Sequence, residues 1–177
     1  MPRHGTMDAT PKVLSGPERR LDLAEWYFWM LDQIAPVNCV IAPRVYGEIT
    51  EPILRQALRA LQNRHPMLRT RVVIQRGGHL DFFDGHGSEI PLQVVEESDE
   101  DVATKLEEEL NTRVSSSECP LMRCVLLTCP GEDYFRLCLT YNHLVGDGVA
   151  GYVITRDLMA AIGAAAEGRP ADLPRGT

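Results

Sequence analysis

The order of hydrophobic and polar residues along the chain predicts a mixture of helices and strands. Residues Leu21 to Asp32 are apolar over much of a helical surface, which predicts a short, largely buried helix. The β-branched residues of 37–48 then predict a strand. Next, Thr50 is a candidate N-cap for a helix that ends near His65, with apolar residues at helical spacing: Ile53, Leu54, Ala57, Leu58 and Leu61.

The middle and end of the chain show further strand and helix patterns. Two strand-like runs flank Gly77-Gly78 and predict a β-hairpin. A short strand around 92–95 and a helix over about 101–113 follow, and the three glutamates at 107–109 are expected to form a solvated helix face. Two further apolar runs flank a turn-like CPGED segment and predict paired antiparallel strands, and a last helical pattern begins at Val149.

These elements predict one α+β domain. A length of 177 residues fits a single domain with its own core, and no internal repeat is visible. Strands and helices do not alternate regularly, which favours an α+β layer fold over a regular βαβ arrangement. We expect a flexible tail over 1–18, a folded lobe over 19–167 and a linker or tail over 168–177.

The composition narrows the class of partner. A formal net charge of -7 and a pI of about 5.2 argue against nucleic-acid binding, which requires clustered Lys and Arg. No apolar run approaches the length of a membrane span and the start of the chain does not resemble a signal peptide, so a cytoplasmic location without a membrane span is expected. The five cysteines form no CxxC pair, which favours reduced, buried thiols and no metal site.

The segment YNHLVGDGVAGY carries the candidate chemistry. His143 follows a predicted strand, and an imidazole is well suited to accept a proton near neutral pH. Asp147 is expected to order the loop through an arginine partner or by capping the next helix, and Gly148 allows a positive φ and a close backbone approach. Two alternatives remain open from these residues: a polar loop without chemistry, and a metal site, for which the sequence provides no third ligand.

The chain contains three motifs in order: RHPMLRT at 64–70, PLMRCVLL at 120–127 and NHLVGDG at 142–148. Together they resemble the condensation-domain-like acyltransferases of the chloramphenicol acetyltransferase-like superfamily. The resemblance implies an α/β sandwich in which helices cover a mixed sheet, and it makes 19–167 a condensation-like amino-terminal lobe. It also implies that His143 acts on an alcohol or amine that attacks an acyl thioester, carried by coenzyme A or by a phosphopantetheine arm. No permanently bound cofactor is expected, and an acyl carrier protein is an expected partner.

The same resemblance assigns roles to the other motif residues. It implies that Asp147 is structural and pairs with an arginine, for which Arg69 is the preferred candidate and Arg64 the second. Backbone N–H groups near Gly148 are candidates for stabilising an oxyanion. The chain departs from the family where Asn142 replaces the common first histidine, a residue that is structural or absent in several branches.

Length is the second departure from the family. Such enzymes have two similar halves that enclose a tunnel, and the motif DFGWG of the second half is not found here. The resemblance therefore implies an amino-terminal half that lacks its carboxy-terminal lobe, so we expect an exposed apolar surface on it. The alternatives are a short acetyltransferase that self-associates and forms its site between subunits, and a non-catalytic module that binds a carrier protein or another partner.

Overall fold

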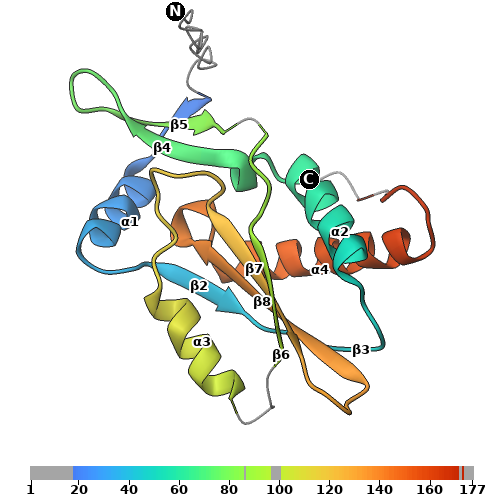
Figure 1. The fold of residues 1–177 in the computed structure, drawn as a ribbon. Coiled ribbons are helices and arrows are strands. Elements are labelled where there is room, and N and C mark those ends of the chain that lie inside the picture. The colour runs from blue at the N-terminus through green and yellow to red at the C-terminus, as the bar shows by residue number, and fades with distance from the viewer. Residues whose placement is uncertain (1–17, 86, 97–100, 172, 174–177) are drawn as a thin grey trace, which may run out of the picture.

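A five-stranded mixed sheet forms the centre of the molecule (Figure 1). The computed structural model describes residues 18–85, 87–96, 101–171 and 173. In the sheet, β8 pairs antiparallel with β7, β2 and β3, and β7 also pairs parallel with β6. The strands are β2 (Asn38–Ile41), β3 (Arg44–Tyr46), β6 (Leu92–Glu96), β7 (Met122–Thr128) and β8 (Tyr134–Asn142).

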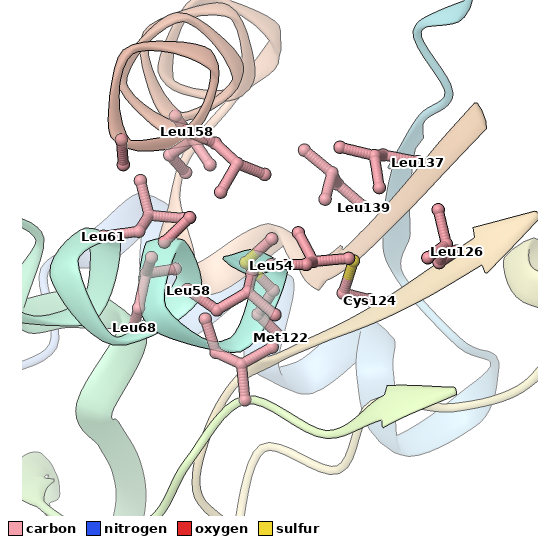
Figure 2. Close-up of a cluster of buried hydrophobic side chains, with 14 of the residues drawn as sticks. Leu54, Leu58, Leu61, Leu68, Met122, Cys124, Leu126, Leu137, Leu139 and Leu158 are labelled. Carbon is pink, nitrogen blue, oxygen red and sulfur yellow. The ribbon is translucent and has the colours of Figure 1, made fainter. Parts of the chain in front are cut away.

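Helices cover both faces of this sheet because β7 and β8 alternate apolar residues to each side. On one face Cys124, Leu126 and Leu139 pack against α2 (Glu51–Arg64) and α4 (Gly148–Ala166), as Figure 2 shows. On the other face Val125 and Leu127 pack against α3 (Val102–Asn111). Each fully buried leucine of this core contributes about 1.5–3 kcal/mol relative to an exposed one.

A smaller three-stranded sheet lies beside one end of this sandwich (Figure 1). Its strands are β1 (Arg19–Arg20), β5 (Leu80–Asp84) and β4 (Thr70–Ile74), all antiparallel. A short 3-10 helix, η1 (Pro66–Arg69), joins α2 to β4. A separate cluster of buried side chains fills the space between this sheet, α1 (Leu23–Ile34) and the segment that follows β8: Leu21, Val72, Leu80, Phe82, Leu121 and Leu144.

The sequence predicted most of these elements. The helix after Thr50, the hairpin at Gly77-Gly78, the strand near 92–95 and the antiparallel pair β7–β8 are all present. The strand expected over 37–48 is two strands, β2 and β3, which both pair with β8. Pro43 lies between them, where its carbonyl accepts from Leu137. Of the expected tail over 1–18, residues 1–17 lie outside the described residues, whereas the Glu18 N–H already donates to the Phe82 carbonyl of β5.

Two predictions about burial are wrong. The apolar helix α1 is not largely buried, because Leu23 is 83% exposed and Ile34 is 81% exposed. Conversely, Glu109 of the acidic run in α3 is buried, and its carboxylate accepts from Arg123 at 2.6 Å and from Thr140 at 2.7 Å. The ion pair with Arg123 compensates the cost of burying a carboxylate and ties α3 to the sheet.

The last helix, α4, has the length and mean hydropathy of a membrane span. This is weak evidence, since buried helices of other proteins meet the same criterion. In this structure Ile154, Leu158 and Ala161 of α4 pack into the core against α2, and the helix carries the ion-paired residues Arg156 and Asp157. The core therefore accounts for part of its apolar character, whereas Val149 and Tyr152 in its first turns are exposed.

Candidate active site

His143 lies directly after β8, at the first position of the 3-10 helix η2 (His143–Val145). Two contacts hold this segment. The His143 N–H donates to the Val37 carbonyl at 2.9 Å, which extends the pairing of β8 with β2. The next side chain, Leu144, is buried in the cluster between α1 and the smaller sheet. The backbone that carries the imidazole is thus held in place, although His143 itself is only half-buried.

Asn142 has a structural position next to this histidine. Its side-chain amide donates to the Val114 carbonyl at 2.9 Å, and its side-chain oxygen accepts from the Leu144 N–H at 3.1 Å. The residue is 1% exposed. Both its side-chain nitrogen and its side-chain oxygen bond to the backbone, so Asn142 orders the loop.

The His143 ring stacks on Phe28 of α1, with ring centroids 4.0 Å apart and planes inclined by 15°. Within the described part of the chain, no group hydrogen-bonds either ring nitrogen of His143. An open pocket of about 310 Å³ lies over the histidine, lined also by Arg19, Asp22, Glu25 and Met67. Phe28 therefore fixes the ring, and the ring nitrogens remain available for a ligand in this pocket.

The acidic end of helix α1 borders the same pocket. Asp22 caps α1 and forms a capping box with Glu25, whose carboxylate also accepts from Arg19 at 2.6 Å. These contacts fix the first turn of α1, and Phe28 lies in the turn that follows. The sequence analysis did not single out Phe28, and the only signal for it was an aromatic residue in an apolar helix.

The exposed carboxylate of Asp147 caps α4 and does not form the predicted ion pair with Arg69. Its carboxylate accepts from the Val149 and Ala150 N–H groups, both at 3.0 Å. The Ala150 N–H contributes most to holding the pKa of Asp147 below its usual value, and His143 makes a smaller contribution. The capping role, which was the other predicted way for Asp147 to order the loop, is the one observed.

Arg69 points elsewhere. Its guanidinium donates to the Gln62 carbonyl at 3.3 Å and lies 3.8 Å from the carboxylate of Asp84 in β5. The predicted Arg69–Asp147 pair is therefore wrong, because η1 directs Arg69 toward the smaller sheet. Arg64, the second candidate, lies in the last turn of α2, and its assignment stays a prediction.

The glycine that the loop requires is Gly146, not Gly148. A Cβ atom on Gly146 would lie 2.3 Å from the Ala150 Cβ, whereas one on Gly148 would meet open space. Gly148 does not have a positive φ and is the first residue of α4. The expected oxyanion donors change as well, because the Val149 and Ala150 N–H groups already bond to Asp147.

The sequence analysis did not predict a contact that another histidine, His65, makes with α4. His65 Nε2 donates to the Asp157 carboxylate at 2.9 Å, and Arg156 donates to the other oxygen of the same carboxylate at 2.7 Å. Asp157 is fully buried in α4, and His65 lies at the end of α2. This contact ties the turn that carries RHPMLRT to the helix that follows His143.

Cysteines and metal ligands complete the picture of the reactive groups. All five cysteines are free thiols, as predicted, but only Cys124, Cys129 and Cys138 are buried, whereas Cys39 and Cys119 are half-buried. Burial raises the pKa of Cys39 and Cys119, which disfavours their reactive thiolate forms. In the described ranges, no group of three or more His, Cys, Asp or Glu side chains is placed to hold a metal ion.

Comparison with known proteins agrees with this geometry. A sandwich of helices on a mixed sheet, with a histidine loop after a central strand, is the chloramphenicol acetyltransferase-like fold. The family model for the condensation domain matches residues 27–177, so the chain belongs to the condensation domain family.

Two relatives and two solved structures illustrate the relationship. The chain is 33% identical over 165 residues to phosphinothricin tripeptide synthetase PhsC of Streptomyces viridochromogenes, covering 87% of this chain and 15% of the relative. It is 31% identical over 158 residues to a dimodular nonribosomal peptide synthase of Bacillus subtilis, covering 88% of this chain and 6% of the relative.

The solved structures match the fold at lower identity. The X-domain from teicoplanin biosynthesis superposes with a TM-score of 0.78 at 24% identity, covering 93% of this chain and 36% of that one. The first condensation domain of the calcium-dependent antibiotic synthetase, in complex with a substrate analogue, gives 0.79 at 18% identity, covering 92% and 40%. The described fold thus spans less than half of these solved chains.

Proposed function

We propose that this chain provides the histidine-bearing lobe of a condensation-type acyltransferase. In this reaction an acyl group moves from a thioester of coenzyme A or phosphopantetheine to an alcohol or amine. The observation that carries the proposal is the His143 ring, which is fixed by Phe28 at the end of β8 and borders an open pocket. Membership of the condensation domain family supports the same reaction class.

His143 acts in this proposal as the general base. The neutral imidazole accepts the proton of the acceptor hydroxyl or amine, whose oxygen or nitrogen forms a bond to the thioester carbonyl carbon. The carbon–sulfur bond then breaks, and the imidazolium of His143 gives this proton to the sulfur, so that the thiol leaves and the neutral imidazole is restored. A positioned base contributes about 100 to 10,000-fold to such a reaction. Asn142 cannot replace it, because an amide has no usable basicity.

A second lobe completes the site in our proposal. Two regions of exposed apolar side chains support this: Leu23, Trp26, Tyr27, Met30 and Ile34 along α1, and Val149 and Tyr152 at the start of α4. The α1 residues recur at helical spacing and therefore form one stripe, which we call the α1 stripe. Exposed apolar surface of this kind marks an interaction site, and the short span of the solved condensation domains that the chain covers points to a carboxy-terminal lobe.

Two other functions are distinguished by experiment. Self-association of this chain would complete a site between subunits, as in a short acetyltransferase. Two features favour a non-catalytic module that binds an acyl carrier protein. Asn142 replaces the first histidine, and the Asp147 carboxylate already accepts from two N–H groups that were candidate donors to the oxyanion. The cytoplasmic location stays a prediction.

The test is acyl transfer by the complete protein that contains this chain. His143→Ala is expected to lower kcat/KM by about 100-fold or more with only a small loss of stability, because the half-buried ring loses its stacking on Phe28, which contributes about 0.5–1.5 kcal/mol. His79→Ala is the matched control, since His79 lies exposed on the β4–β5 hairpin. Near wild-type transfer by His143→Ala would refute the mechanism, and rapid transfer by the 177-residue chain alone would favour self-association.

A further inference from the structure

Three pockets meet at Met67 of η1. The first is the pocket of about 310 Å³ over His143. The second, of about 260 Å³, lies between η1 and the first turns of α4. The third, of about 210 Å³, lies against β1 and β5 and is lined by the charged residues Arg19, Arg69 and Asp84. Met67 lines all three, so its side chain is a wall common to them.

The second pocket is apolar, and we call it the α4 pocket. Pro66, Val149, Val153 and Ile154 line it together with Met67 and Val145. Among the described residues that line it, the one polar side chain is His65, whose Nε2 is already bonded to Asp157. Such a lining offers little to a charged or strongly polar group, but it suits an aliphatic chain.

The α4 pocket is separated from the pocket over His143 by two side chains. Both Met67 and Val145 line the two pockets. Each pocket alone is near or below the lower limit of about 300 Å³ for small-molecule sites. If the dividing side chains move aside, the two become one site that runs from the histidine to the start of α4.

Met67 is suited to such movement, because hydrogen bonds hold its backbone while its unbranched side chain is only half-buried. Its carbonyl accepts from both the N–H and the hydroxyl of Thr70, the latter at 2.9 Å. The following residue, Leu68, is fully buried. The methionine side chain itself is unbranched and adapts its shape readily. It is half-buried, and its sulfur lies 4.0 Å from the Arg19 guanidinium.

We propose that the α4 pocket binds the aliphatic part of the acyl donor and that Met67 sets how long a chain it admits. This rests on the proposed function, in which the thioester lies over His143. From there an acyl chain has two directions past Met67. The charged pocket at Arg19, Arg69 and Asp84 disfavours hydrocarbon, so the chain enters the α4 pocket instead.

Binding of acyl-pantetheine analogues to the 177-residue chain tests the proposal directly. Amide analogues with butanoyl, octanoyl and dodecanoyl groups are not cleaved, so affinity is measured without chemistry. Met67→Ala is expected to shift the preference toward dodecanoyl by about tenfold or more, since one methylene in an apolar pocket changes discrimination by about 10-fold or more. Met67→Phe fills the passage and is expected to restrict binding to the butanoyl analogue.

Met30→Ala is the matched control, because Met30 is a partly exposed methionine on the α1 stripe. It should leave the preference for chain length unchanged. In the wild-type chain with labelled methionine methyl groups, the octanoyl analogue should shift the Met67 signal and leave the Met30 signal in place. This second measurement does not depend on whether the Met67 variants fold.

An unchanged preference in Met67→Ala, or equal shifts of the Met67 and Met30 signals, would overturn the proposal. Its failure is distinguishable from failure of the proposed function. Substitution of His143 by alanine should lower transfer by the complete protein by about 100-fold or more but leave the chain-length preference in the binding assay. Transfer that survives His143→Ala would refute the general-base role of His143. A chain-length preference that does not depend on Met67 would refute only the acyl-pocket proposal.

Discussion

Substitution of Asp157 by asparagine tests how the RHPMLRT turn is held against α4. Asp157 is fully buried and its carboxylate accepts from His65 and Arg156. Hydrogen bonds to charged groups contribute about 1.5–3 kcal/mol. Breaking a fully buried ion pair would cost about 3–5 kcal/mol, but the Arg156 side chain is 51% exposed and keeps part of its hydration.

We therefore expect Asp157→Asn to lower the free energy of unfolding by about 1.5–3 kcal/mol. For a domain of this size, that loss corresponds to an unfolding temperature lower by about 3–12 °C. Circular dichroism on heating measures this. Asp133→Asn is the control, because Asp133 lies exposed in the turn between β7 and β8 and its replacement should cost less than about 0.5 kcal/mol.

The pH dependence gives a second, independent readout. Burial raises the pKa of Asp157, but hydrogen bonds from Arg156 and His65 outweigh it, so the pKa is lowered in the folded state. A carboxylate with a lowered pKa stabilises the fold above its unfolded pKa of about 3.9, and this stabilisation is lost as the pH falls through the folded value. The difference between wild type and Asp157→Asn should therefore be constant near neutral pH and shrink below about pH 4.

Two results would refute this reasoning. If Asp157→Asn unfolds at the wild-type temperature near neutral pH, the buried contact does not stabilise the fold. If the difference persists undiminished in acid, the loss has a cause other than the charge of Asp157, such as altered packing of α4 on α2.

Two further predictions concern helix α1. Phe28→Leu should lower kcat of the complete protein by about 2 to 10-fold with little change in KM, because an aromatic pair contributes about 0.5–1.5 kcal/mol to holding His143; an unchanged kcat would show that the stack does not position the base. Replacing Leu23 and Ile34 together by lysine should reduce self-association, or binding of a co-expressed carboxy-terminal lobe, in sedimentation experiments, with less than about 0.5 kcal/mol lost per site. Undiminished association would exclude the α1 stripe as the interface.

Local patterns in the sequence predicted the elements, but not the burial of each one. The α2 helix and the β4–β5 hairpin follow from helical spacing and from a glycine pair, which are signals within a few residues. The apolar pattern of α1 also predicted a helix correctly. It did not reveal exposure, because an apolar stripe has the same sequence pattern whether it faces the core of its own lobe or another surface.

In the candidate site, local sequence patterns likewise did not predict contacts between residues that are distant in the sequence. The position of His143 after a strand and the capping role of Asp147 follow from neighbouring residues. The contact between His65 and Asp157 joins residues 92 positions apart, and nothing in either local pattern indicates it. Arg69 was assigned to Asp147 by motif resemblance, whereas the geometry of η1 directs it to Asp84.

The arrangement of fixed and exposed groups indicates what a second lobe must add. The histidine is already positioned, because Leu144 anchors η2 and Phe28 stacks on the ring. The oxyanion is not provided for in the same way, since Asp147 occupies the Val149 and Ala150 N–H groups at the start of α4. A positioned donor in a site that excludes water typically contributes about 10²–10³ in rate. In the proposed function, the partner surface is therefore expected to cover the pocket over His143 and to supply that donor, while this chain is proposed to contribute the base and the acyl pocket.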